Sequence, residues 1–309
     1  MKILIELPSW LGDVVMATPA IENLINHYND AEINIIGSNS SIELLSNHPK
    51  VSSFTVLKKK YYSLFKTAIN LGKFDSYFSF RQSFRSRVFK FLILSSQKYQ
   101  FNKNHYVNMH QVEKYNSFIN DAIKKNYKAG KLIINKQNNS DLDKSNRILG
   151  INPGASYGSS KRWYPEKFAE VAFELSSQYE IIIFGGPDEK NIALDIEDIL
   201  INKGVLNYRN LAGKTSISEL IEYISKLDLF ISGDSGPMHI AASFQIPTVA
   251  IFGPTRDEET SQWKNENSKI VKKSLPCQPC MKRKCPLMHH NCMRMIHAKD
   301  IINLVESIN

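Results

Sequence analysis

The stretch ISGDSGPMHIAASFQIPTVAIFGPT, residues 231–255, has the pattern of a strand end, a tight loop, a helix, a turn and a second strand. Asp234 or Ser235 can cap a helix that begins near Pro237, because proline is well tolerated in a first helical turn. His239 would then lie in that first turn. Such a loop presents free backbone N–H groups and the positive end of a helix dipole, which suits an anion such as phosphate. An ordinary strand-to-helix turn with a capping aspartate is the alternative.

The same alternation of short apolar runs and helical patterns extends outward along the whole chain. We expect strands at 2–7, 32–37, 53–57, 74–80, 131–135, 147–152, 180–184, 208–211 and 227–231, and helices at 13–27, 40–47, 61–71, 81–95, 110–125, 168–178, 189–203, 218–226 and 298–308. Pro19 lies inside the first helical pattern and can kink or split it. Strands that alternate with helices predict an α/β fold with parallel sheets.

A polar stretch, KQNNSDLDKSN at 136–146, interrupts this alternation and has the composition of a linker or an exposed loop. It predicts two domains of similar size, residues 1–140 and 141–309. Ligands of open α/β sheets bind at the carboxyl ends of the strands, so a site in a cleft between two such domains is expected.

The bulk composition favours anionic partners. The 309 residues carry a formal net charge of +9, and the pI is near 9.2. Nucleic acid, an anionic membrane surface and phosphorylated substrates all fit this charge. No run approaches the roughly 18 apolar residues that a membrane span needs. The N-terminal MKILIELPSW has no signal-peptide pattern and is typical of a first strand, so a cytoplasmic protein is expected.

The segment SWLGD, residues 9–13, follows the first expected strand. Asp13 would lie at the start of the first helix, where a carboxylate commonly serves as a cap. A carboxylate at a strand end can also act as a general base toward a hydroxyl that attacks. Both interpretations of Asp13 remain open at this point.

Two loops of the second half add candidate ligands for a nucleotide. NPGASYGSSKRW, residues 152–163, combines small residues with Lys161, and its amides, hydroxyls and ammonium suit a diphosphate. A solvated basic loop is the alternative. FGGPDE, residues 184–189, places Asp188 or Glu189 where an acid can bond ribose hydroxyls, although GGPDE is also a good turn sequence. Each of these groups follows an expected strand, so all of them can converge on one site.

At these motifs the chain resembles the ADP-heptose:lipopolysaccharide heptosyltransferases of glycosyltransferase family 9. The matching segments are ILIELPSWLGDVVMATPAI, INPGASYGSSKRWYPEKFAEVA, SGDSGPMHIAASFQIPTVAIFGPT and PCQPCMKRKCPLMHHNCM. The last of these is most similar to the heptosyltransferase II branch. Residues 51–130 match only in general pattern.

The resemblance implies a GT-B fold, with two Rossmann-like domains that face a central cleft. The N-terminal domain would bind the acceptor, and the C-terminal domain would bind the nucleotide sugar. Asp13 matches the catalytic base. The positions that match donor-binding residues are Lys161, Glu189, Thr215, Asp234, Ser235, Gly236 and His239.

The implied reaction is inverting transfer of L-glycero-D-manno-heptose from ADP-heptose to the phosphorylated inner core of lipopolysaccharide. Asp13 would accept the proton of the acceptor hydroxyl, while Lys161 and the helix after Asp234 would stabilise the ADP that leaves. No Asp-x-Asp motif stands in the functional loops, since DLD at 141–143 falls in the polar stretch, so no cofactor is required for catalysis. Such an enzyme would work in the cytoplasm at the inner face of the inner membrane.

All the cysteines gather in a basic segment, residues 276–294: Cys277, Cys280, Cys285 and Cys292. A cytosolic chain seldom forms disulfides, so a structural zinc ion is one interpretation. Four thiols in a compact basic loop, with no metal, is the other. This segment also raises a second class of function, a nucleic-acid-binding protein, although we expect no nucleic-acid partner.

Basic residues also concentrate in the first half, around 58–66 and 81–90, with aromatic residues between them. A solvated helix face is the simplest interpretation. Contact with an anionic membrane surface and a phosphorylated acceptor is the functional one. We therefore take Arg81 and Arg85, with Ser9 and Trp10 after the first strand, as candidate acceptor-binding residues. A related glycosyltransferase that uses another nucleotide sugar is the alternative to the heptosyltransferase.

Overall fold

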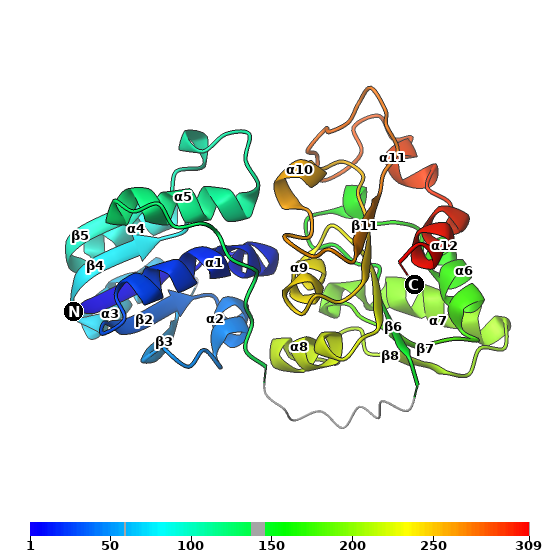
Figure 1. Cartoon of the computed structure of the whole chain (residues 1–309), viewed down its shortest axis with the longest axis horizontal. Helices are drawn as coiled ribbons and strands as arrows, with labels where there is room; N and C mark the ends of the chain where they lie inside the picture. Colours follow the sequence, from blue (N-terminus) through cyan, green and yellow to red (C-terminus); the bar gives the residue numbers. More distant parts are fainter. Residues whose placement is uncertain (59, 137–145, 309) are drawn as a thin grey trace. The chain divides into compact units, whose positions relative to one another are not determined.

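A computed structural model of the chain describes residues 1–58, 60–136 and 146–308, which form two compact α/β units (Figure 1). The units span Met1–Gln137 and Asn138–Asn309. The domain boundary expected between residues 140 and 141 lies outside the described residues, as does the DLD sequence at 141–143.

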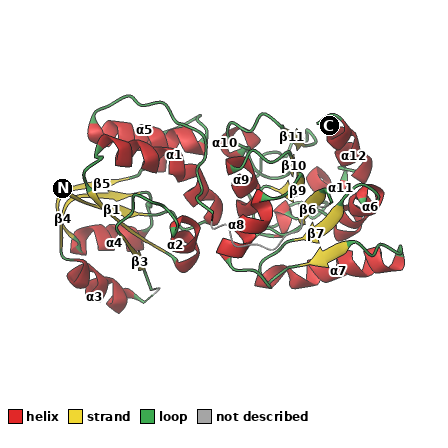
Figure 2. Cartoon of the chain, turned by 60° about the horizontal axis from the view of Figure 1, so that its bottom comes forward, coloured by secondary structure: helices red, strands yellow, loops and turns green. Residues whose placement is uncertain are grey.

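The first unit is built on a five-stranded parallel sheet with the order β3-β2-β1-β4-β5. The strands are β1 (Lys2–Glu6), β2 (Glu32–Gly37), β3 (Ser53–Val56), β4 (Lys73–Ser79) and β5 (Leu94–Gln100), and the helices are α1 (Leu11–His27), α2 (Asn39–Leu45), α3 (Tyr61–Leu71), α4 (Phe84–Leu92), η1 (Lys103–His105) and α5 (Gln111–Ile123). The chain runs outward from β1 to β3 and then returns to the other side of β1, so the strand order reverses between β1 and β4. Helices α1 and α5 cover one face of the sheet, and α3 and α4 cover the other (Figure 2).

Two expectations for the first unit are wrong. The helix expected over 81–95 is shorter, and β5, which follows it, was not predicted. β5 forms one edge of the sheet and its sequence, LSSQKYQ, is mostly polar, so it lacks the apolar run that marks a buried strand. The segment 131–135 is not a strand, and the Ile133 amide donates instead to the Thr18 hydroxyl of α1 at 3.0 Å.

Helix α1 continues through Pro19 without a break. Proline has no amide proton, so Pro19 cannot donate to the carbonyl of Val15, four residues earlier. The Thr18 hydroxyl donates to that carbonyl at 2.8 Å, and it thereby replaces the missing hydrogen bond. α1 has 17 residues, and within the described ranges no helix is long and apolar enough to cross a lipid bilayer.

The second unit contains a six-stranded parallel sheet with the order β11-β10-β9-β6-β7-β8. The strands are β6 (Ile148–Asn152), β7 (Glu180–Ile183), β8 (Tyr208–Asn210), β9 (Leu229–Gly233), β10 (Thr248–Ile251) and β11 (Ser268–Val271), and the helices are η2 (Ser159–Lys161), α6 (Pro165–Leu175), η3 (Pro187–Glu189), α7 (Lys190–Asn202), α8 (Ile217–Ser225), α9 (Gly236–Ser243), α10 (Asp257–Thr260), α11 (Asn291–Arg294) and α12 (Ala298–Glu306). The main core lies between the sheet and helices α6, α7 and α12. The elements α10, β11 and α11 were not predicted. Here the strand order reverses between β6 and β9, the place where open α/β sheets bind ligands.

Candidate active site

In the second unit, the loops after β6 and β9 meet at the carboxyl edge of the sheet, where the strand order reverses. β6 and β9 are direct neighbours, with Asn152 opposite Ser232. The Asn152 side-chain amide donates to the Ser235 hydroxyl at 3.2 Å and joins the two loops. The sequence placed these loops after two strands, and the sheet topology makes them neighbours.

A buried ion pair links the two loops. Lys161 Nζ lies 2.5 Å from Asp234 Oδ2, and the two side chains are 12% and 6% exposed. The Thr255 hydroxyl, which follows β10, donates to the same oxygen at 2.7 Å. The Asp234 carboxylate is therefore engaged by two donors, and a carboxylate repels phosphate. This geometry suits Asp234 to hold Lys161 in place and leaves Lys161 as the group that would meet an anion.

The first turn of α9 lies beside this pair. Ser235 occupies the N-cap position, but its side chain makes no capping bond, so the expected capping by Asp234 or Ser235 is wrong. The Ser235 hydroxyl is instead bonded to Asn152 and to Ser232, at 3.2 and 3.0 Å. The backbone amides that follow Gly236 therefore open an eight-residue helix without a side-chain cap, and such amides suit an anion. His239 is buried in the same turn.

The acid after β7 folds back onto the loop after β6. Glu189 is buried, and its Oε2 accepts the Gly186 amide at 2.7 Å. A Cβ added to Gly154 would lie 2.0 Å from the Glu189 carboxyl carbon, so only glycine leaves room for this carboxylate. Asp188 is exposed. Of the two acids that the sequence offered, Glu189 is therefore the one that joins the neighbouring loop.

The loops after β7 and β8 are tied to each other. The Gly213 amide donates to the Gly185 carbonyl at 2.8 Å. Gly213 has a φ of +67°, which favours glycine, and a Cβ there would also approach Lys190. Thr215 is half-buried and stands just before Ser216, the N-cap of α8. Thr215 thus borders the same edge of the sheet, two strands away from β6.

In the first unit, Asp13 lies in the first turn of α1. The N-cap position belongs to Trp10, so the capping interpretation of Asp13 is wrong. Tyr115 of α5 hydrogen-bonds to Asp13, a contact that no local sequence pattern indicates. Burial raises the pKa of Tyr115 well above its ordinary value, and the Asp13 carboxylate raises it further. Tyr115 therefore stays protonated and donates to Asp13. Ser9 and Trp10, which precede Asp13 in the sequence, are exposed.

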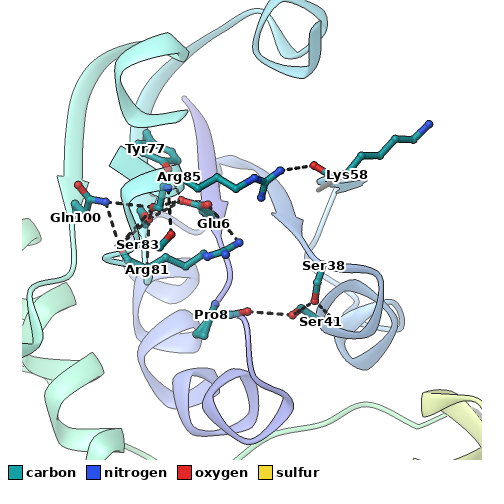
Figure 3. Close-up of polar contacts among 12 residues, drawn as sticks. Glu6, Pro8, Ser38, Ser41, Lys58, Tyr77, Arg81, Ser83, Arg85 and Gln100 are labelled. Atoms are coloured by element: carbon teal, nitrogen blue, oxygen red, sulfur yellow. Dashed lines mark hydrogen bonds and ion pairs between the residues drawn. The ribbon is translucent and has the colours of Figure 1, made fainter. Parts of the chain in front are cut away.

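Glu6 organises the place where the strand order of this sheet reverses (Figure 3). The buried Glu6 Oε2 accepts three hydroxyls, from Tyr77 at 2.6 Å, Ser79 at 2.6 Å and Ser86 at 2.8 Å. Burial and then the Glu6 carboxylate raise the pKa of Tyr77 well above its ordinary value. Glu6 was not among the predicted site residues, because one acidic residue in a strand gives no sequence signal.

Two arginines surround this carboxylate. Arg81 Nη1 lies 3.8 Å from Glu6 Oε1, and the Arg85 guanidinium donates to the Lys58 carbonyl (Figure 3). Burial, and then the positive charge of Arg81, lower the pKa of Arg85. Within the described residues, the Nε atoms of Arg81 and Arg85 are buried and have no hydrogen-bond partner. Two adjacent guanidinium groups beside the single Glu6 carboxylate leave an excess of positive charge, which suits an anionic ligand.

The four cysteines line one small cavity together with His289 and His290. Each is a free thiol. Burial, and then the three neighbouring thiols, raise the pKa of Cys292 to about 11. Across the described part of the chain, however, no group of three or more His, Cys, Asp or Glu side chains is arranged to hold a metal ion. Zinc at this cluster therefore stays a prediction from its composition and spacing.

The cysteine-rich segment braces the loop that carries Lys161. Ser160 makes two hydrogen bonds to this segment. Its hydroxyl donates to the Lys282 carbonyl at 2.5 Å, and its amide donates to the Arg283 carbonyl at 3.2 Å. The Tyr157 hydroxyl donates to the Met281 carbonyl at 2.7 Å. The Lys161 ammonium lies over the Tyr157 ring, 4.7 Å from its centroid. This segment thus has a structural role that the sequence did not reveal, since its partners are more than 120 residues away.

The chain is similar to a known protein family, to named relatives and to solved structures. The chain matches the description "Glycosyltransferase family 9 (heptosyltransferase)" over residues 64–290. Lipooligosaccharide heptosyltransferase 2 of Campylobacter jejuni is 42% identical over 317 aligned positions, which cover 100% of this chain and 98% of that protein. The solved structure of E. coli ADP-heptose lps heptosyltransferase II has a TM-score of 0.79 at 21% identity, with 100% and 98% of the chains covered. A glycosyl transferase family 9 structure from Veillonella parvula has a TM-score of 0.82 at 18% identity, with 99% and 96% covered. The predicted fold class, two parallel-sheet α/β domains of the GT-B type, is confirmed.

Proposed function

The chain belongs to glycosyltransferase family 9, the heptosyltransferases, and we propose that it transfers L-glycero-D-manno-heptose from ADP-heptose to the inner core of lipopolysaccharide. The relative from C. jejuni that aligns along the whole chain is named lipooligosaccharide heptosyltransferase 2, and the E. coli structure is named for ADP-heptose. Both names favour a heptosyltransferase of type II as the function of this chain.

The observation that carries the donor half of the proposal is the Lys161–Asp234 pair beside the first turn of α9. A fixed ammonium and a set of helix-terminal amides supply positive charge from two directions, which suits a diphosphate. Glu189 and Thr215, on the neighbouring loops, are assigned to the ribose and the adenine. Ser235, Gly236 and His239 complete the proposed donor site.

In the proposed reaction, Asp13 accepts the proton of an acceptor hydroxyl as the oxygen attacks the anomeric carbon of heptose. The new C–O bond forms on the face opposite the bond to ADP, which breaks, so the configuration inverts. The negative charge that develops on ADP is stabilised by Lys161 and the α9 amides. Because these groups already supply the charge, the proposal includes no divalent metal. The hydrogen bond from the Tyr115 hydroxyl would orient the Asp13 carboxylate toward the acceptor.

For the acceptor we propose Arg81 and Arg85 as the groups that bind its phosphate, together with Ser9 and Trp10, which follow β1 and precede Asp13 in the sequence. The support is the charge around Glu6: Arg81 lies beside this single carboxylate, and burial and the positive charge of Arg81 lower the pKa of the neighbouring Arg85. Arginine forms paired hydrogen bonds with phosphate, which a solvated surface lysine does not. A lipid-linked acceptor places the enzyme at the inner face of the inner membrane in this proposal.

A thermal-shift panel tests the donor assignment. ADP and ADP-heptose should raise the melting temperature, whereas UDP, GDP and their sugar conjugates should have little effect. Lys161→Ala should remove most of the shift, because it deletes a charge-assisted bond worth about 1.5–3 kcal/mol, or roughly 10–150-fold in affinity. Lys273→Ala is the matched control, since Lys273 is paired with Asp300 at 2.8 Å in the same unit. A uridine or guanosine preference would reject ADP-heptose, and an unchanged shift in Lys161→Ala would reject the role of Lys161.

A further inference from the structure

Helix α3 exposes an apolar stripe on its outer side. Tyr62, Phe65 and Ile69 stand three or four residues apart and are 79%, 55% and 60% exposed. The opposite stripe, Leu64 and Ala68, is buried in the core against the sheet. α3 therefore has two apolar sides, of which the sheet covers one.

Helix α4 repeats this arrangement. Phe84 and Phe91 are 70% and 84% exposed, and Leu94, at the start of β5, is 62% exposed. Phe89, on the other side of α4, is fully buried. The two helices pack against each other on the same face of the first sheet (Figure 2). We call their outer surface, formed by Tyr62, Phe65, Lys66, Ile69, Phe84, Arg87 and Phe91, the α3–α4 face.

The α3–α4 face is positively charged and lacks acidic side chains. Neither helix contains Asp or Glu, and Lys66 and Arg87 are exposed beside the aromatic residues. Residues 50–105 contain twelve Lys or Arg and one Asp, while the rest of the chain contains 27 Lys or Arg and 29 Asp or Glu. The net positive charge of the whole chain thus comes from the segment that carries this face.

We propose that the α3–α4 face docks on an anionic lipid bilayer. Exposed aromatic rings interleaved with basic side chains suit the lipid interface, where the rings enter the headgroup region and the cations meet acidic headgroups. A solvated helix face would not expose this many large apolar side chains. A second copy of this chain is the alternative occupant that the experiment below distinguishes.

The face also adjoins the proposed acceptor site, and in this respect the inference rests on the proposed function. Arg85 belongs to α4, and its guanidinium donates to the carbonyl of Lys58, which lies just before α3. A bilayer against α3 and α4 would therefore lie next to Arg81 and Arg85, where the phosphate of a lipid-linked acceptor is expected. Docking would bring the enzyme to its acceptor without a membrane span.

Co-sedimentation with vesicles tests the proposal, using the full chain without donor or acceptor. The wild type should bind vesicles of phosphatidylcholine mixed with phosphatidylglycerol, should bind phosphatidylcholine alone far more weakly, and should dissociate as salt is added. Lys66→Gln with Arg87→Gln should weaken binding about 25-fold, from about fivefold for each cation near an anionic surface. Tyr62→Ser with Phe91→Ser should weaken it at least about tenfold, through lost apolar burial.

The controls are Leu206→Ser and Lys299→Gln, which alter an exposed leucine and an exposed helical lysine of the second unit. Both should bind vesicles like the wild type, and all variants should keep their ADP-induced thermal shift, which shows that they are folded. Wild-type protein that stays in the supernatant, or α3–α4 variants that bind as well as the controls, would overturn the proposal. A dimer that the Tyr62→Ser, Phe91→Ser variant dissociates, without vesicle binding, would assign the face to a second copy. Because the vesicles contain no substrate, the outcome does not depend on whether the enzyme transfers heptose.

Discussion

Replacing Asp234 by asparagine should destabilise the second unit much more than the same change in a surface ion pair. Asp234 Oδ2 lies 2.5 Å from Lys161 Nζ and accepts the Thr255 hydroxyl at 2.7 Å, with both members of the ion pair largely buried. Asparagine keeps the shape of the side chain but removes its charge. The ammonium of Lys161 then loses its counter-ion in a place where water reaches it poorly.

The size of the effect follows from this burial. Removing one partner of a buried ion pair costs about 3–5 kcal/mol, and we expect about 2–3 kcal/mol here because Lys161 lies near the edge of the sheet and can turn partly toward water. For a unit of this size, that loss lowers the melting temperature by about 4–12 °C. The control is Asp257→Asn: Lys272 lies 2.7 Å from Asp257 but is 50% exposed, so the expected loss is below about 1 kcal/mol.

Differential scanning calorimetry is the suitable assay, since it can resolve the unfolding of two units. The double variant Asp234→Asn, Lys161→Met should lose less stability than the sum of the two single variants, because it leaves no unpaired buried charge. Adding ADP should partly restore the Asp234→Asn protein, as the diphosphate offers Lys161 a new partner. Equal melting temperatures for Asp234→Asn and Asp257→Asn would refute the reasoning, because the pair would then contribute no more than a surface contact.

The proposed base, the buried glutamate and the cysteine cluster each allow a separate test. Asp13→Asn should leave ADP binding intact and lower turnover on the order of 10²–10⁴-fold; near-normal turnover would remove Asp13 from the mechanism. Glu6→Gln should destabilise the first unit by about 2–4 kcal/mol, since three hydroxyl bonds lose their charged acceptor, and an unchanged calorimetric transition would contradict this. For the cysteines we predict about one zinc per chain in protein purified without added metal. Chelation should then lower both the melting temperature and the affinity for ADP, because the segment braces the Lys161 loop; metal-free protein with the same stability would reject the metal.

The sequence by itself was sufficient for the regular part of the fold. Helix α3 begins and ends at the predicted residues, and the strands β2, β7 and β9 lie within one or two residues of their apolar runs. These elements depend on local patterns, namely the period of the apolar residues and the turn residues beside them. The loops after β6, β7 and β9 could also be placed, because small residues and charges follow directly after buried strands.

Polar strands at the edges of the sheets could not be predicted from the sequence. β5 and β11 lie at the edges of their sheets, where one side faces solvent and few apolar residues are needed, so no apolar run marks them. The segment 131–135 has the opposite property. Its apolar residues resemble a strand, yet Leu132 and Ile134 are buried without joining a sheet, and the Ile133 amide donates to a side chain of α1. In both cases the sequence pattern is local, whereas the structure of the segment depends on a neighbouring strand or helix that is distant in the sequence.

Tertiary structure alone decided which polar groups meet. Lys161 and Asp234 are 73 residues apart and pair because β6 and β9 are adjacent in the sheet. Glu6 gathers hydroxyls from 71 to 80 residues away, and the cysteine-rich segment holds a loop more than 120 residues before it. A residue type fixes what a side chain can donate or accept, and strand order fixes which partner stands opposite. The sequence therefore determined the chemistry available to this protein, and the sheet topology determined where that chemistry is assembled.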